Sequence, residues 1–199
     1  MKKLIILFPA FSLIISLGHA QEKYEGLGWA CVGVTVPSGN YSDALDNGLD
    51  VEVNAIRPLG SNVGVGFSLR YSQLSYKSSE YDGPYKLLLS NGYLALGSFD
   101  PSSRFVFCGL LGLGMHFTFK SERKPTYLGY PYYPTQGTEP KSGYWLGVEF
   151  GGVVGYRFSE QFGICGKIQY DILTKFVEGS NYFSAKVGLM LSFRAFSRK

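Results

Sequence analysis

Two carboxylates and one histidine are the residues of this chain whose types and spacing could carry out chemistry. Glu149 and Asp171 lie in two alternating segments joined by the turn at 159–161. If those segments pair as antiparallel strands about Glu160, the two carboxylates face each other. Buried side by side, they repel each other unless one takes up a proton or cations intervene, so a proton-linked or catalytic acid pair is one interpretation.

His116 is the second candidate, since the other histidine of the chain, His19, lies near the N-terminus. Thr118 follows two residues later, which places both on one face of a strand, and Glu122 is close in sequence. A base beside a hydroxyl with an acid behind it is the minimum for an activated nucleophile. The alternative, which we favour, is a histidine at the rim of the fold that merely forms hydrogen bonds.

The elements that position these residues alternate with a period of two over the hairpin 143–173. One face of its first segment consists of Tyr144, Leu146, Val148, Phe150, Gly152, Val154, Tyr156 and Phe158. The other face consists of Trp145, Gly147, Glu149, Gly151, Val153, Gly155 and Arg157. The alternation indicates β-strands. Long strands, aromatic ends and a charged, glycine-rich second face favour strands that cross a membrane with the apolar face toward lipid.

Eight such segments span the chain, and we expect an all-β, eight-stranded antiparallel transmembrane up-and-down β-barrel. The segments are Tyr24–Val36, Leu49–Arg57, Val63–Tyr76, Tyr85–Phe99, Arg104–Phe119, Tyr144–Phe158, Phe162–Ile172 and Tyr182–Phe196. The facing of the first, fourth and fifth segments stays open, and Asn91-Gly92 suggests a bulge. Connections alternate between long and short, with the long ones after the first, third, fifth and seventh segments. This rhythm is typical of outer-membrane barrels.

The N-terminus predicts export. Residues 1–20 combine Lys2 and Lys3 with an apolar run and end in Gly18-His19-Ala20, which is the pattern of a cleaved signal peptide. Pro9 and the shortness of the run argue against a membrane helix. Residues 21–199 then form one barrel domain, and its net charge falls from +4 to +2 when Lys2 and Lys3 are removed. Such a weak charge does not indicate a nucleic-acid partner.

These segments and connections resemble the small outer-membrane β-barrels of the OmpA and OmpX type and the broad outer membrane protein beta-barrel domain family. The resemblance covers nearly all of residues 21–199 and rests on architecture rather than on a diagnostic motif. It implies an outer-membrane location in a Gram-negative bacterium, contact with outer-membrane lipid and with the insertion machinery, and a monomer. Members of this family often end on a terminal Phe or Trp. The chain departs from that pattern, because Phe196 is followed by Ser197-Arg198-Lys199.

An eight-stranded barrel is narrow enough to be filled by its own side chains. Pairing of the second and third segments about Gly60 places Asp50 opposite Arg70, and an even closure of the last hairpin places Lys186 near Asp171. We therefore expect an ion network in the lumen, acting as a plug rather than as a reactive site. Its members would be Asp50, Glu52, Arg70, Glu149, Arg157, Lys167, Asp171 and Lys186.

Cysteines and glycines give no evidence of a cofactor or metal site. Cys31, Cys108 and Cys165 all fall inside strands, and an odd number cannot all pair, which favours small buried hydrophobic residues over a disulfide framework. The glycine strings at 109–114 and 147–155 lack the strand, tight turn and helix of a nucleotide-binding loop.

The segment 120–142 is the best functional candidate. Its tyrosines Tyr127, Tyr130, Tyr132 and Tyr133 alternate with prolines. Aromatic side chains are common on recognition surfaces, so this segment could bind an extracellular ligand or a host surface. Equally, the tyrosines could lie at the lipid headgroups or cap the barrel.

We expect a non-enzymatic protein with a plugged lumen and a structural or surface-interaction role. A small porin-like or secretion-accessory barrel is the first alternative. The second alternative is a lipid A-modifying enzyme, since the deacylase and palmitoyltransferase barrels use His with Ser and a carboxylate. Thr118 in place of Ser argues against it.

Overall fold

The computed structural model describes residues 26–39, 41–100, 102–123, 127–128, 133–134, 142–173 and 180–193. The expected signal peptide, residues 1–20, and the chain end after Phe193 lie outside the described residues. Eight long strands form the body of the molecule. They are β1 (Gly26–Gly39), β2 (Leu45–Pro58), β3 (Val63–Tyr76), β5 (Tyr85–Ser98), β6 (Phe105–Phe119), β10 (Ser142–Arg157), β11 (Phe162–Leu173) and β12 (Ser180–Phe193).

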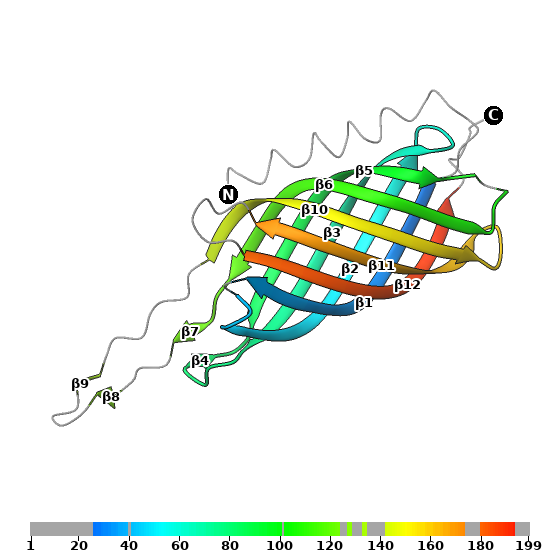
Figure 1. Cartoon of the computed structure of the whole chain (residues 1–199). Helices are drawn as coiled ribbons and strands as arrows, with labels where there is room; N and C mark the ends of the chain where they lie inside the picture. The colour runs from blue at the N-terminus through cyan, green and yellow to red at the C-terminus, as the bar shows by residue number, and fades with distance from the viewer. Residues whose placement is uncertain are drawn as a thin grey trace.

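The eight strands form one closed antiparallel barrel in which each strand pairs with its neighbours in the sequence (Figure 1). The seam joins the first and last strands, where β1 pairs with β12 from Gly26 opposite Phe193 to Gly39 opposite Ser180. The predicted fold class is therefore confirmed. Within the described part of the chain, no helix is long and apolar enough to span a membrane.

Burial alternates along every strand and settles the facing that the sequence left open. On β1, Trp29, Cys31 and Thr35 point into the barrel, whereas Val32 and Val34 point outward. The corresponding inward residues of β5 include Tyr85, Leu87, Leu89, Asn91, Tyr93 and Ala95. Those of β6 include Val106, Cys108, Leu110, His116 and Thr118.

The expected bulge at Asn91-Gly92 is absent, because β5 keeps an unbroken register with both of its neighbours there. Asn91 points inward to other polar groups. Gly92 faces outward, and a Cβ atom built on it meets nothing within 4 Å. The Asn-Gly pair therefore follows the ordinary alternation of a strand.

The first connection is shorter than the sequence suggested. β1 continues to Gly39 and β2 begins at Leu45, so the expected loop 37–48 shrinks to residues 40–44. Gly39 has a φ of 65°, which glycine adopts easily, and its carbonyl accepts the Ser42 N–H at 3.0 Å. A register shift between Leu45 and Gly48 absorbs the remaining residues inside β2. Polar residues that looked like a loop thus belong to strands.

The other connections follow the expected rhythm only in part. Residues 77–84, 120–141 and 174–179 join strands at the same end as residues 40–44, and we call this the loop end. The turns 59–62, 99–104 and 158–161 lie at the opposite end, the turn end. The rhythm is weaker than expected, because neither 40–44 nor 174–179 exceeds the turn 99–104 in length.

Four short strands lie in the loop-end connections. β4 (Tyr81–Asp82) pairs with β7 (Glu122–Arg123), which links the second and third loops to each other. β8 (Tyr127–Leu128) pairs with β9 (Tyr133–Pro134). Figure 1 shows β8 and β9 beyond the end of the barrel, farther out than β4 and β7. The segment expected to be a simple loop therefore contains a small hairpin.

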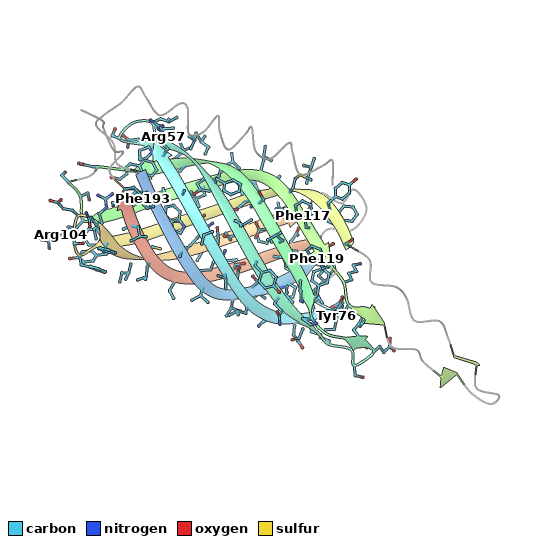
Figure 2. All side chains as sticks on the ribbon, turned by 180° about the vertical axis from the view of Figure 1, so that it is seen from behind. Arg57, Tyr76, Arg104, Phe117, Phe119 and Phe193 are labelled. Atoms are coloured by element: carbon cyan, nitrogen blue, oxygen red, sulfur yellow. The ribbon has the colours of Figure 1, made fainter. Side chains whose placement is uncertain are left out.

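The outer face of the barrel is apolar and its ends are aromatic (Figure 2). Exposed Val51, Leu111 and Ile168 lie along the middle of their strands. Exposed aromatic side chains flank them: Phe105, Phe158, Phe162 and Phe193 toward the turn end, and Tyr71, Phe119, Tyr144 and Phe183 toward the loop end. These apolar residues face outward, whereas most charged residues of the long strands face inward.

Candidate functional site in the barrel interior

The interior is built in three layers along the barrel. A hydrophobic cluster at the turn end contains Leu27, Ile56, Phe99, Val106 and Met190, together with all three cysteines. A second cluster at the loop end contains Leu45, Leu74, Tyr85, Leu173 and Tyr182. The buried charged residues other than Arg157 lie between these clusters. Fully buried charges are rare in proteins and need partners, so the contacts of this middle layer decide what it can do.

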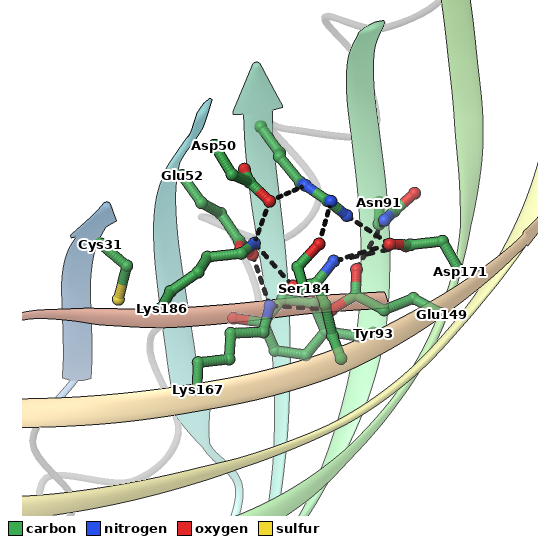
Figure 3. A network of polar contacts seen from close by, with 12 residues as sticks. Cys31, Asp50, Glu52, Asn91, Tyr93, Glu149, Lys167, Asp171, Ser184 and Lys186 are labelled. Carbon is green, nitrogen blue, oxygen red and sulfur yellow. Dashed lines mark hydrogen bonds and ion pairs between the residues drawn. The ribbon is translucent and has the colours of Figure 1, made fainter. Parts of the chain in front are cut away.

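Glu52 on β2 is the centre of the charged layer (Figure 3). It accepts short hydrogen bonds from Lys167 on β11 and Lys186 on β12, two lysines that lie directly opposite each other in the β11–β12 register. Lys167 also donates to Glu149 at 2.8 Å. Lys186 donates to Gln169 at 2.8 Å and lies 3.4 Å from Asp50. Each lysine is therefore held by two acceptors or more, which offsets the repulsion between them.

Arg70 on β3 organises the other half of the layer. Its guanidinium lies 2.7 Å from Asp50 and forms a short contact with Asp171. It also donates to the hydroxyls of Thr35, at 2.8 Å, and Ser184. Because Arg70 contacts both Asp50 on β2 and Asp171 on β11, it joins the charges of these two strands into one network.

His116 on β6 lies at the edge of this network, fully buried. Its Nε2 atom is 3.2 Å from Oδ1 of Asn91, whose Nδ2 donates to Glu149 at 2.6 Å. Thr118 instead donates to the carbonyl of Gly143 at 3.4 Å. The expected rim position of His116 is wrong, and no hydrogen bond joins it to Thr118 among the described residues. The side chain of Glu122 lies outside those that the structure describes.

The structure corrects two of the expected pairings. Glu149 does lie opposite Asp171. However, Arg70 lies opposite Glu52, and Asp50 lies opposite Ser72, because the β2–β3 turn is centred one residue later than Gly60. Long side chains reach across this two-residue offset, so Arg70 still contacts Asp50. Lys186 lies opposite Lys167 rather than near Asp171, whose partner in the register is Tyr182.

Arg157 does not join this cluster. It is buried at the turn end of β10, eight residues from Glu149 and thus roughly 26 Å along the strand. Its side chain points inward, as expected, but into the turn-end layer. Inward facing alone did not specify depth along the barrel.

The charged residues of the middle layer are paired with one another. Four carboxylates, Asp50, Glu52, Glu149 and Asp171, contact three cations, Arg70, Lys167 and Lys186. All seven side chains are at most 3% exposed. Within the described part of the chain, no three His, Cys, Asp or Glu side chains converge as metal ligands would.

Several members of the network were missed in the sequence. Asn91, Thr35, Ser184 and Gln169 are uncharged polar residues on the inner face, and each bonds to a charged group. Period-two alternation placed Gln169 and Ser184 on the inward face. Thr35 and Asn91 lie on strands whose facing was ambiguous, so no signal assigned them.

The expected recognition segment is described only in part. Tyr127 and Tyr133 belong to β8 and β9, of which the structure gives the backbone arrangement. Tyr130 and Tyr132 lie outside the described residues.

Solved structures with the same architecture come from bacterial outer membranes. No family model and no curated protein sequence matches the chain. The attachment invasion locus protein Ail of Yersinia pestis superposes with a TM-score of 0.54 at 14% identity, over 85% of this chain and 99% of Ail. Neisserial surface protein A gives 0.54 at 14% identity, over 85% and 97% of the two chains. OprG of Pseudomonas aeruginosa gives 0.53 at 11% identity, over 88% and 99%.

The chain has the fold of a small outer-membrane barrel. At these identities the likeness establishes the fold alone and not the activity. The resemblance inferred from strand alternation and connection lengths is thereby supported at the level of architecture.

Proposed function

We propose that this protein is an outer-membrane barrel that is closed by its own interior side chains and acts at the cell surface through its loop end. The observation that carries the proposal is the reversed distribution of polarity. Val51, Leu111 and Ile168 are exposed, whereas Arg70, Lys167 and Glu52 are buried. Water would favour the opposite arrangement, and lipid favours this one.

The dimensions of the strands support a membrane location. Most of the long strands contain 14 residues or more, and the shortest contains 12. A tilted membrane strand needs about 9–11 residues. The aromatic residues near both strand ends are spaced to lie at the two lipid interfaces.

Heat-modifiable migration tests the fold and the location together. Outer-membrane fractions are run on a gel with and without boiling. We expect a fast-migrating folded form in the unboiled outer-membrane fraction that shifts on boiling. Recovery of the protein in the soluble fraction would refute the location.

A closed lumen is supported by the layered interior. The charged layer has ion pairs across it, and apolar clusters cover it on both sides. We expect no stable channels when the purified protein is reconstituted in planar bilayers. Stable single-channel steps would instead support a small porin-like or secretion-accessory barrel.

A surface role is supported by the β8–β9 hairpin, which extends beyond the barrel and carries Tyr127 and Tyr133. A segment that projects in this way is accessible to a partner outside the cell, which supports the proposal. Ail, which shares the fold, is named for attachment and has been solved with the heparin analogue sucrose octasulfate. We propose an extracellular ligand or host surface as the partner of this hairpin.

Deleting residues 127–133 tests the surface role. We expect the deletion variant to keep its heat-modifiable band but to bind less to host cells. A deletion of residues 78–80 in the second loop controls for shortening a loop. A 127–133 variant that no longer reaches the outer membrane would show that the hairpin is needed for folding instead.

A non-enzymatic role is part of the proposal. His116 is fully buried and its Nε2 atom faces Asn91, so its imidazole is not accessible to a lipid ester outside the barrel. We expect mass spectra of lipid A to be the same in cells with and without the gene. A change in acyl chains that is lost in His116→Ala would establish an enzyme.

A further inference from the structure

Cys31 and Cys165 meet inside the barrel, although 134 positions separate them in the sequence. Their Sγ atoms are 3.7 Å apart, in the apolar layer next to Glu52. The two side chains are 3% and 5% exposed. No other thiol pair is in contact among the described residues. We propose that these two residues form an intramolecular disulfide that links β1 to β11 across the closing seam of the barrel.

The strand register brings the two thiols together. Gly188 of β12 lies opposite Cys31 on one side and opposite Cys165 on the other. A Cβ atom at position 188 would lie 2.7 Å from the Cys31 sulfur. Because residue 188 is glycine, no side chain separates the thiols.

Curvature of the barrel reduces the distance that the link must span. Alternate strands of a flat sheet lie about 9.6 Å apart, too far for a disulfide. Here Cα atoms of β1 and β11 approach within 8 Å although β12 lies between them. The sulfurs must move closer by about 1.7 Å to reach the bonded distance.

The oxidant is a disulfide-bearing thiol oxidase of the space between the two membranes, which the proposed outer-membrane location requires the chain to cross. One cysteine thiolate attacks a sulfur of the oxidase disulfide and releases the other as a thiolate. The second cysteine thiolate then attacks the mixed disulfide and releases the oxidase. The two electrons leave with the oxidase, now a dithiol, and the two thiol protons go to its sulfurs through solvent.

The exchange occurs before the seam closes, because both thiols are buried afterwards. Once formed, the bond holds the first strand to the last hairpin, where β1 and β12 have no covalent link through a turn. Cys108 on β6 stays a thiol, since Cys31 and Cys165 form a disulfide with each other.

Counting free thiols in the protein from outer membranes tests the proposal. Membranes are acid-quenched, denatured and treated with a maleimide polymer that slows the gel band at each free thiol. In Cys108→Ala we expect no adduct without prior reduction and two adducts after it. The control C31A/C108A, which keeps Cys165, should give one adduct under both conditions. Two adducts without reduction in Cys108→Ala would overturn the proposal.

A second measurement uses the native sequence and does not depend on a variant that folds. Non-reducing digestion and mass spectrometry should yield a linked pair of peptides containing Cys31 and Cys165. A link that includes Cys108, a link between two chains, or three free thiols would each overturn it. The same membranes are checked for the heat-modifiable band. Free thiols in a folded outer-membrane barrel would refute the disulfide alone, whereas absence from the outer membrane would refute the proposed location.

Discussion

Lys186→Met is the sharpest perturbation of the interior network, because it removes one charge and nearly preserves side-chain length. Lys186 contacts Glu52, Asp50 at 3.4 Å and Gln169 at 2.8 Å. Its loss leaves four buried carboxylates with two cations, Arg70 and Lys167. Removing one partner of a buried ion pair costs about 3–5 kcal/mol, so the free energy of unfolding should fall by about that amount.

The double variant E52Q/K186M separates the ion pair from the packing. In K186M, Glu52 has lost one of its two lysines. Adding E52Q removes this under-neutralised carboxylate, while Lys167 keeps its contact with Glu149 at 2.8 Å. We expect the double variant to be more stable than K186M, with a coupling energy of about 1–3 kcal/mol.

The assay is urea unfolding in lipid vesicles, followed by the fluorescence of Trp29 and Trp145, which are the two tryptophans. Lys77→Met is the matched control, since Lys77 is exposed and, among the described contacts, its side chain donates only to the Ser42 carbonyl. It should change stability by less than about 0.5 kcal/mol. A K186M variant as stable as K77M would show that the network does not hold the barrel closed. Strictly additive effects of E52Q and K186M in the double-mutant cycle would show the same.

Three further predictions concern packing, the neutral part of the network and the outer face. Gly97→Ala should reduce the yield of folded barrel, because its Cβ would lie 2.0 Å from the Phe107 carbonyl; Gly109→Ala, with 3.8 Å of clearance, should fold normally on a heat-modifiability gel. Asn91→Leu should lower the free energy of unfolding in urea by about 1–3 kcal/mol, because it removes the donor to Glu149. Ile168→Arg on the outer face should cost about 2–4 kcal/mol in vesicles and Val63→Arg, at the strand end, about 0–1; equal costs would contradict burial of this face in lipid.

The sequence predicts the barrel well, because the two signals it needs are local. Alternation with a period of two needs only neighbouring residues, and a short turn fixes the register of the hairpin it closes. The β10–β11 hairpin has both signals, so Glu149 was placed opposite Asp171 from the position of Glu160. The bulge in β2 and the Gly39 turn were hidden, because their polar residues are equally suited to a loop.

The contents of the interior are harder to predict, because they depend on strands that are distant in the sequence. The contact of Arg70 with Asp171 joins β3 to β11, and that of Lys186 with Glu52 joins β12 to β2. Such pairs depend on the stagger of every strand around the barrel, including the seam, and no single turn determines it. Side-chain length matters as well, since Arg70 reaches Asp50 across a register offset. The alternation gave the inward face of Arg157 but not its depth.

This dependence suggests why charges are kept in an interior that apolar residues could fill. Sliding β12 by one residue along β1 would turn Lys186 outward and leave Glu52 with one lysine. The hydrophobic layers penalise such a slip less, because outward residues such as Val187 are also apolar and could pack inside. The network therefore contributes more to the choice of a single register at the seam than to total stability. If so, E52Q/K186M should regain stability relative to K186M but should still close the barrel in more than one register. Cysteines placed on β1 and β12 would trap such misregistered seams as disulfides and distinguish the two effects.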